Sequence, residues 1–291
     1  MSTAVLERSK AKDRTRYEFG VRDIVYQRHG GKERLLRLYQ PAGTGPFPAI
    51  VAVHGGAWNN KDRTDGQHAA LELCAAGILV ASLDFRNAPE APYPASLQDI
   101  NCGIRWLKAH AHEFGSSAER VGGYGWSSGG HQILLAAIRP DDPRYRALPL
   151  EEAPDMDARL AFVISGWGVL YPLERYQLAK ARGKTDMVAS HDRYFGDEAT
   201  QIEATPGLAI DRGEKVHLPP ALVFQGTADD WVPNDQAERL AASWRRAGGA
   251  MELAWFEGEP HTFITEKPLA PNSIKAIATV AAFIKKHGAG K

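Results

Sequence analysis

Residues 47–54 have the sequence FPAIVAVH and form an almost continuous apolar run. A run of this kind fits a strand that is covered on both faces, because a half-exposed strand would alternate apolar and polar residues. Further strand-length runs follow it, and longer segments with apolar residues at helical spacing separate them. Strands that alternate with helices need crossover connections, which are typical of parallel sheets. This alternation predicts an α/β fold.

The runs predict eight strands and five helices. The strands are expected at residues 17–27, 33–39, 47–54, 78–84, 119–126, 160–165, 221–225 and 251–256. The helices are expected at residues 67–76, 97–110, 128–138, 236–247 and 273–286. The first two strands are joined by a glycine turn at residues 29–31, so we expect them to pair antiparallel at one edge of a mostly parallel sheet.

About 50 residues separate the sixth predicted strand from the seventh, and this segment is rich in Tyr, Trp, Arg and Asp. A long insertion inside a compact domain is usually functional. We therefore predict a lid or cap at about residues 167–218. The rest of the chain is expected to form a single domain over residues 17–291, after a flexible N-terminus at residues 1–16.

The charge balance excludes some classes of partner. The chain has 35 Lys and Arg against 35 Asp and Glu, so no basic excess indicates nucleic acid or an anionic membrane. No apolar stretch approaches the roughly 20 residues of a membrane helix, and the N-terminus lacks the apolar run of a signal peptide. A cytoplasmic location is expected.

Cys74 and Cys102 are predicted to be buried free thiols. They are too few and too far apart in the sequence for a zinc site.

Residues 123–131 have the sequence GYGWSSGGH and contain the pattern Gly125-x-Ser127-x-Gly129. Ser127 follows a predicted strand and precedes a predicted helix, which is the context of a nucleophile elbow. The turn is sharp there, so the positions two before and two after the serine must be small. The alternative interpretation is a glycine-rich turn in which the serine only caps the helix.

A catalytic serine needs a base, and the base needs an orienting carboxylate. In this topology the acid follows a late strand and the histidine follows the last one. Asp229 lies in GTADDWVP after the seventh predicted strand, and His261 lies in GEPHTF after the eighth. Alone, Asp229 could be a turn or cap residue and His261 a loop residue. The spacing to Val-Pro favours Asp229 over Asp230 as the acid.

The segment HGGAW at residues 54–58 follows the third predicted strand. Backbone N–H groups stabilise the oxyanion of acyl transfer, and glycines let the backbone approach the substrate. We predict that the N–H groups of Gly55, Gly56 and Ser128 form this oxyanion hole, and that His54 holds the loop. Three tryptophans are candidates for the wall of a substrate pocket: Trp58, Trp126 and Trp231.

The chain resembles the α/β-hydrolases, in particular the hormone-sensitive-lipase-like and bacterial feruloyl-esterase-like carboxylesterases. The resemblance rests on HGGAW, DFRNAPEAPYPASLQD, GWSSGG, GTADDWVP and GEPHTF, which begin at residues 54, 84, 125, 226 and 258. It implies the α/β-hydrolase fold, with an eight-stranded sheet flanked by helices, and a Ser–Asp–His triad. The chain departs from the family pattern at Ser128, where an alanine is frequent, and in FRNAPE at residues 85–90, where the family has Tyr-Arg-Leu-Ala-Pro-Glu.

The expected activity is serine-dependent hydrolysis of small to medium acyl or aryl esters through an acyl-enzyme intermediate. No metal or organic cofactor is expected, and the expected partner is a small ester. The fold supports a homodimer through an edge strand or the last helix, but nothing in the sequence requires one. An arylformamidase or another amide or peptide hydrolase would use the same triad. A ligand-binding protein on this scaffold is a further alternative, although such proteins usually lose a triad member.

Overall fold

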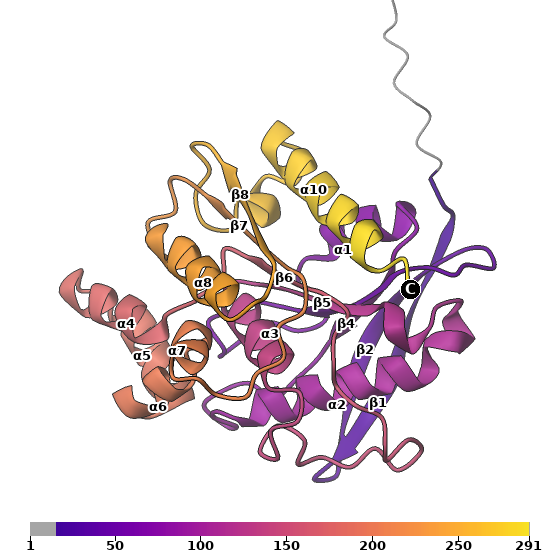
Figure 1. Ribbon diagram of the computed structural model, residues 1–291, viewed down its shortest axis with the longest axis horizontal. Coiled ribbons are helices and arrows are strands. Elements are labelled where there is room, and N and C mark those ends of the chain that lie inside the picture. Colours follow the sequence, from indigo (N-terminus) through magenta and orange to yellow (C-terminus); the bar gives the residue numbers. More distant parts are fainter. Residues whose placement is uncertain (1–15, 291) are drawn as a thin grey trace, which may run out of the picture.

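The computed structural model describes residues 16–290 and has one eight-stranded sheet at its centre (Figure 1). The strand order is β1-β2-β4-β3-β5-β6-β7-β8. The strands are β1 (Phe19–His29), β2 (Lys32–Pro41), β3 (Ala49–Val53), β4 (Leu79–Leu83), β5 (Val121–Trp126), β6 (Val163–Gly166), β7 (Ala221–Gly226) and β8 (Met251–Phe256). Apart from Arg16, the predicted flexible N-terminus lies outside the described residues.

The strand directions confirm the predicted mostly parallel sheet. β2 pairs antiparallel with both β1 and β4, and every other neighbouring pair is parallel. The β1–β2 turn contains Gly30 and Gly31 with φ of +58° and +73°, a region that glycine adopts without strain. The antiparallel strands thus lie at one edge, and the carboxyl ends of β3 and β5–β8 lie side by side.

The helices cover both faces of the sheet (Figure 1). On one face lie α1 (Gln67–Ala75) and α10 (Pro271–His287), and on the other lie α2 (Ala95–His110), α3 (Ser128–Ile138) and α8 (Asp235–Arg246). In β3 the side chains alternate between the two cores, with Val51 in one and Ile50 in the other. This double coverage is the reason why residues 47–53 are apolar throughout.

The sequence pattern missed the helices of the insertion between β6 and β7. They are α4 (Pro172–Ala181), α5 (Thr185–Phe195), α6 (Glu198–Glu203) and α7 (Pro206–Asp211). Two of them, α6 and α7, have only 6 residues each, and α4 and α7 begin at a proline, whose fixed φ suits the first helical turn. Short helices show little apolar periodicity in sequence. The insertion forms one group at the side of the sheet (Figure 1), and its role as a lid stays a prediction.

Smaller differences concern element ends. The sixth strand starts at Val163 rather than residue 160, and α2 starts at Ala95 rather than residue 97. The one-turn helices α9 (Phe263–Glu266), η1 (Ala111–Phe114) and η2 (Ala118–Arg120) were not predicted.

Cys74 and Cys102 are buried and free, as expected. Within residues 16–290 no helix has the length and apolar character that crossing a membrane requires.

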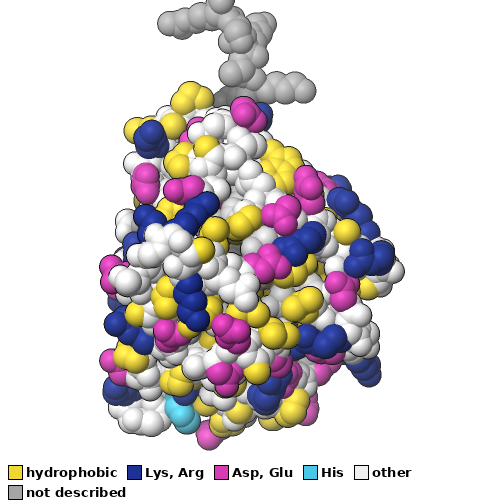
Figure 2. Space-filling model, turned by 90° about the vertical axis from the view of Figure 1, so that its left-hand side faces the viewer, with side chains coloured by type: hydrophobic (Ala, Val, Ile, Leu, Met, Phe, Trp, Pro, Cys, Tyr) yellow, Lys and Arg dark blue, Asp and Glu magenta, His cyan; other side chains and the backbone are white. Residues whose placement is uncertain are grey.

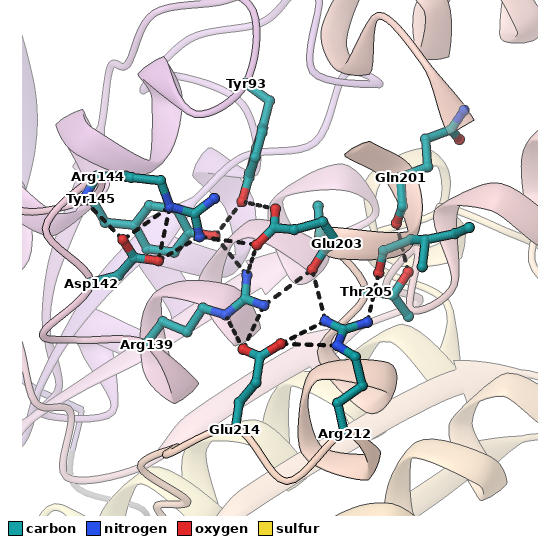
Figure 3. Close-up of polar contacts among 12 residues, drawn as sticks. Tyr93, Arg139, Asp142, Arg144, Tyr145, Gln201, Glu203, Thr205, Arg212 and Glu214 are labelled. Atoms are coloured by element: carbon teal, nitrogen blue, oxygen red, sulfur yellow. Dashed lines mark hydrogen bonds and ion pairs between the residues drawn. The ribbon is translucent and has the colours of Figure 1, made fainter. Parts of the chain in front are cut away.

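Arg139, directly after α3, fastens the insertion to the body of the domain (Figure 3). Its guanidinium donates to Glu203 at 2.7 Å and to Glu214 at 2.8 Å, and the residue is only 7% exposed. Glu203 also accepts hydrogen bonds from Tyr93 and Arg144. Burial raises the pKa of Glu203, but the bonds from Arg144 and Tyr93 outweigh it and hold the pKa below its usual range.

Asp99 on α2 joins three separate parts of the chain. Its side chain is fully buried and forms an ion pair with Arg86, at 2.9 Å from Nε. It also accepts from the backbone N–H of Arg86 at 2.7 Å and from the amide of Gln27 on β1 at 3.0 Å. These bonds hold the loop after β4, where the FRNAPE departure occurs, against α2 and β1.

Replacing Asp99 by Ala is expected to lower the free energy of unfolding by about 3–5 kcal/mol, because the partly buried Arg86 charge loses its partner. Urea unfolding measures the loss. The matched control is Glu252→Ala, which breaks the exposed Lys286–Glu252 pair and should cost less than about 1 kcal/mol. Equal losses in the two variants would contradict the role of Asp99.

The Glu203 contacts predict a pH-dependent contribution to stability. Because the folded-state pKa of Glu203 is lowered, its stabilising effect is complete above the ordinary carboxyl pKa and is lost as pH falls through the folded value. The difference in free energy of unfolding between wild type and Glu203→Gln should therefore be constant above about pH 5.5 and shrink in acid. Urea unfolding at several pH values tests this. A difference that grows in acid would overturn it.

Candidate active site

Ser127 lies in a strained turn between β5 and α3. Its φ of 52° and ψ of −123° are unusual for a residue with a side chain. The turn needs glycines: a Cβ on Gly125 would lie 2.3 Å from the carbonyl oxygen of Gly129, and one on Gly129 would lie 2.2 Å from that of Val53. The close packing explains why both positions are glycine, and the turn places the serine at the carboxyl edge of the sheet.

Ser127, His261 and Asp229 form a continuous chain of hydrogen bonds. Ser127 Oγ lies 3.0 Å from His261 Nε2, and His261 Nδ1 lies 2.8 Å from Asp229 Oδ2. The side chain of Asp229 is fully buried and that of His261 is 10% exposed. Asp229 follows β7 and His261 follows β8, so the neighbouring parallel strands bring both groups to the same edge as the serine. The structure thus brings together the three predicted catalytic residues.

The loop after β7 orients the Asp229 carboxylate. Its second oxygen, Oδ1, accepts hydrogen bonds from the backbone N–H groups of Trp231 at 2.9 Å and Val232 at 3.0 Å. These bonds leave Oδ2 for His261. A carboxylate in this position holds the Nδ1–H tautomer of the ring, which leaves Nε2 free to accept the serine proton. Asp230 is exposed, and the structure brings Asp229 rather than Asp230 to the histidine.

The predicted oxyanion donors lie beside the serine. Gly55 is so close that an added Cβ would lie 3.2 Å from the Cβ of Ser127. Gly56 has a φ of +96°, and a Cβ there would lie 2.3 Å from the carbonyl oxygen of Asn60. In residues 16–290 the N–H groups of Gly55, Gly56 and Ser128 donate to no other protein atom. They are therefore available for an anion between the two loops.

His54 has the surroundings of a structural residue. Its ring is 2% exposed and stacks on Phe85 with a centroid distance of 4.1 Å. Nδ1–H donates to the carbonyl oxygen of Gly55 at 2.9 Å, and burial lowers the pKa of the ring. This geometry holds the loop, as predicted. The described residues contain no group of three or more His, Cys, Asp or Glu side chains that could bind a metal ion.

Trp58 anchors the oxyanion loop inside the protein. Its backbone N–H donates to Ser128 Oγ at 3.1 Å, so the serine that departs from the family pattern connects the loop to α3. The Trp58 ring is 1% exposed and stacks on Tyr194 of the insertion. Its Nε1–H donates to His131 Nδ1, and His131 in turn donates to the Ala204 carbonyl. The sequence motif does not reveal this connection, since it carries no information on side-chain direction.

The other two tryptophans lie nearer to open space. Trp231 is 44% exposed and stacks on His261, with ring centroids 6.1 Å apart. Trp126 donates from Nε1 to Asp65 at 2.9 Å and lines a cavity of about 170 Å³ together with Trp167. Trp231 therefore borders the histidine, Trp126 borders a cavity, and Trp58 is enclosed.

Ser128→Ala should leave the buried Trp58 N–H without an acceptor and lower the free energy of unfolding by about 1–3 kcal/mol. Urea unfolding measures the change. Ser117→Ala is the matched control, because Ser117 makes only an exposed bond to Glu119 and its loss should change stability by less than about 0.5 kcal/mol. A Ser128→Ala variant as stable as the control would refute the link between the loop and α3.

Comparisons with known proteins point to esterases. The sequence profile of a family described as BD-FAE matches residues 36–244. Esterase LipC of Mycobacterium tuberculosis is 31% identical over 72% of this chain and 52% of its own length. The probable isoprenylcysteine alpha-carbonyl methylesterase ICMEL1 of Arabidopsis thaliana is 26% identical over 83% of this chain and 50% of its own length. The chain thus spans about half of the length of these curated relatives.

Solved structures share the fold. A thermophilic esterase of Thermogutta terrifontis, Est2, superposes with a TM-score of 0.73 at 24% identity and 91% coverage of each chain. Further structures of that esterase carry propionate and butyrate. A hyperthermophilic esterase of Pyrobaculum calidifontis has a TM-score of 0.74 at 22% identity, over 92% of this chain and 85% of its own. At this identity the likeness establishes the fold.

Proposed function

The chain belongs to the BD-FAE family and has the predicted α/β-hydrolase fold, and on this premise we propose that it hydrolyses carboxylic esters through an acyl-enzyme on Ser127. The observation that carries the proposal is the hydrogen-bonded chain from Ser127 through His261 to Asp229. The esterase names of the similar proteins support the same reaction class.

In the first half of the reaction, Ser127 Oγ attacks the ester carbonyl while His261 Nε2 takes its proton. Asp229 holds Nδ1–H and stabilises the imidazolium that forms. The negative charge that develops on the carbonyl oxygen accepts hydrogen bonds from the oxyanion donors defined above. Because those N–H groups have no acceptor in the described part of the chain and lie on packed backbone, they need little reorganisation when the charge appears.

In the second half, the tetrahedral intermediate collapses, and the C–O bond to the alcohol breaks as His261 gives its proton to the leaving oxygen. The acyl group remains on Ser127. A water molecule then attacks the acyl carbon and His261 takes its proton. Collapse of the second intermediate returns that proton to Ser127 Oγ and releases the carboxylic acid, so atoms and protons balance over the cycle.

We propose small to medium acyl or aryl esters as substrates. The cavity beside Trp126 has a volume of about 170 Å³, which has room for a short acyl chain rather than a long lipid. The propionate and butyrate bound to the Thermogutta terrifontis esterase support a short acyl group. The exposed indole of Trp231 next to His261 offers a flat surface for an aryl leaving group.

Replacing Ser127 or His261 by Ala is expected to lower turnover of 4-nitrophenyl esters by about 10⁴–10⁶, and Asp229→Ala somewhat less, because each removes one member of a cooperating unit. Initial rates on acetate to decanoate esters, on methyl ferulate and on an N-formyl anilide measure this. Ser190→Ala is the control. The Ser190 hydroxyl donates to the carbonyl oxygen of Asp186 in its own helix, so its loss should leave activity unchanged.

Labelling with a fluorophosphonate, followed by mass spectrometry, should modify Ser127 in wild type and not in Ser127→Ala. Substantial ester turnover by pure Ser127→Ala protein would refute the mechanism. A formanilide rate at or above the ester rate would assign the triad to amide hydrolysis. Tight binding of a small ligand without turnover or labelling would indicate a binding protein.

A further inference from the structure

Arg175 on α4 is a buried cation without a protein partner. The residue is 3% exposed, and among residues 16–290 its guanidinium makes no hydrogen bond or ion pair. Two of its nitrogens, Nε and Nη1, are completely enclosed and have no acceptor. A buried arginine is ordinarily paired, because an unsatisfied buried charge costs several kcal/mol. This side chain is therefore an exception that needs an explanation.

The group is charged at neutral pH. Burial lowers the pKa of Arg175 to about 10, and the charge of Asp229 raises it, so the guanidinium stays protonated. The Asp229 carboxylate is not its hydrogen-bonding partner, since both oxygens are already bonded to His261 and to the backbone of the following loop. The guanidinium lies over the Trp58 ring, whose centroid is 5.7 Å from Cζ.

Arg175 lies between the two loops that form the candidate active site. On one side is Trp58, whose backbone follows the oxyanion glycines and is bonded to Ser128. On the other side is a small cavity that Arg175 lines together with Trp231. Since Trp231 stacks on His261, this cavity is separated from the catalytic histidine by a single indole ring. The Trp231 indole is 44% exposed, and a group on a bound ester would have to pass it to enter the vicinity of Arg175.

The cavity has the charge of an anion site. Besides Arg175 it is lined by Arg182 and Lys184, against one carboxylate, that of Asp230. Arg182 donates to the backbone carbonyl of Asp230, and neither Lys184 nor Asp230 forms an ion pair within the described residues. By contrast, basic and acidic side chains are interspersed over the outer face of the molecule on this side (Figure 2). The excess of positive charge is thus local to the cavity.

We propose that Arg175 binds a carboxylate of the substrate, so that the preferred esters are anionic, such as half-esters of dicarboxylic acids or acyl esters of a hydroxybenzoic acid. Nη2 is the guanidinium nitrogen that is not completely enclosed, and it can donate a charge-assisted hydrogen bond to such a carboxylate. The inference rests on the proposed ester hydrolysis and adds the substrate class. On this proposal, a residue of the insertion recognises a charged group of the substrate that lies away from the reacting carbonyl.

The test compares two esters in each pair. One ester carries a free carboxylate away from the scissile bond, and in the other that carboxylate is replaced by a neutral carboxamide. One pair carries the charge on the acyl side, mono-(4-nitrophenyl) adipate against 4-nitrophenyl adipamate, and the other on the leaving group, 4-acetoxybenzoate against 4-acetoxybenzamide. Wild type should prefer one carboxylate member by about 10- to 100-fold in kcat/KM, as expected for charge-assisted hydrogen bonds. The pair that shows the preference identifies the side on which the carboxylate lies.

Arg175→Met should abolish this preference and leave kcat/KM on the neutral amides within about threefold. The variant should fold, because methionine keeps the apolar stem and removes an unpaired buried charge. Arg175→Lys should keep a reduced preference, since the ammonium keeps the positive charge but is more strongly hydrated than the guanidinium. Arg193→Met is the control for net charge, because Arg193 is an exposed arginine of the same insertion.

The outcomes separate this inference from the proposed function. If wild type hydrolyses the neutral esters through Ser127 but shows no carboxylate preference, ester hydrolysis stands and the role of Arg175 is refuted. If Arg175→Met lowers both members of a pair equally, the arginine acts on Asp229 and His261 instead of on the substrate. If wild type hydrolyses none of the esters, ester hydrolysis itself fails.

Discussion

The strained turn at Ser127 is the constraint on which the site depends. A side chain in this conformation persists only where the surrounding backbone holds it, and here three backbone segments are in close contact. Gly129 packs against the backbone of Val53 and His54, and Gly125 packs against Gly129. These backbone contacts fix the distance between the Ser127 turn and the start of the oxyanion loop. The distance between the serine oxygen and the anion donors therefore depends on the packing of glycine backbone, together with the bond from the Trp58 N–H to Ser128 Oγ.

The insertion is coupled to that turn through Trp58. The backbone of Trp58 is bonded to Ser128, while its ring contacts Tyr194 and Arg175 of the insertion. Any shift of α4 or α5 would move the indole, and the indole would move the oxyanion loop. At its far end the insertion is fixed by the bonds of Arg139 to Glu203 and Glu214, which limit such shifts. Substrate recognition and oxyanion stabilisation thus share one rigid connection.

The sequence predicted the sheet and the triad geometry because both follow from strong local signals. Buried parallel strands are continuous apolar runs, and their carboxyl ends meet at one edge, so the order of strands along the chain is enough to bring Asp229 and His261 to Ser127. The insertion was different: α6 and α7 have only 6 residues each, and α4 and α5 were missed although they are as long as α1 and α3, which the pattern did predict. The direction of the Trp58 ring depends on a φ of 63° at a residue that is not glycine, which no propensity predicts. The unpaired state of Arg175 depends on which side chains fail to reach it, and that emerges only in three dimensions.

A buried charge without a partner lowers stability, so its presence beside an active site has a consequence for catalysis. The guanidinium of Arg175 is dehydrated when the chain folds, before any substrate binds, so the cost of removing its water lowers the stability of the free protein. A substrate carboxylate then meets a guanidinium that is already dehydrated and held by the Trp58 ring, and little further reorganisation is needed. Binding energy gained at this remote group can be used to fix the ester against Ser127, because Arg175 and the oxyanion loop are joined through the same tryptophan. The lost stability of the insertion and the orientation of the substrate are in this sense two effects of one residue.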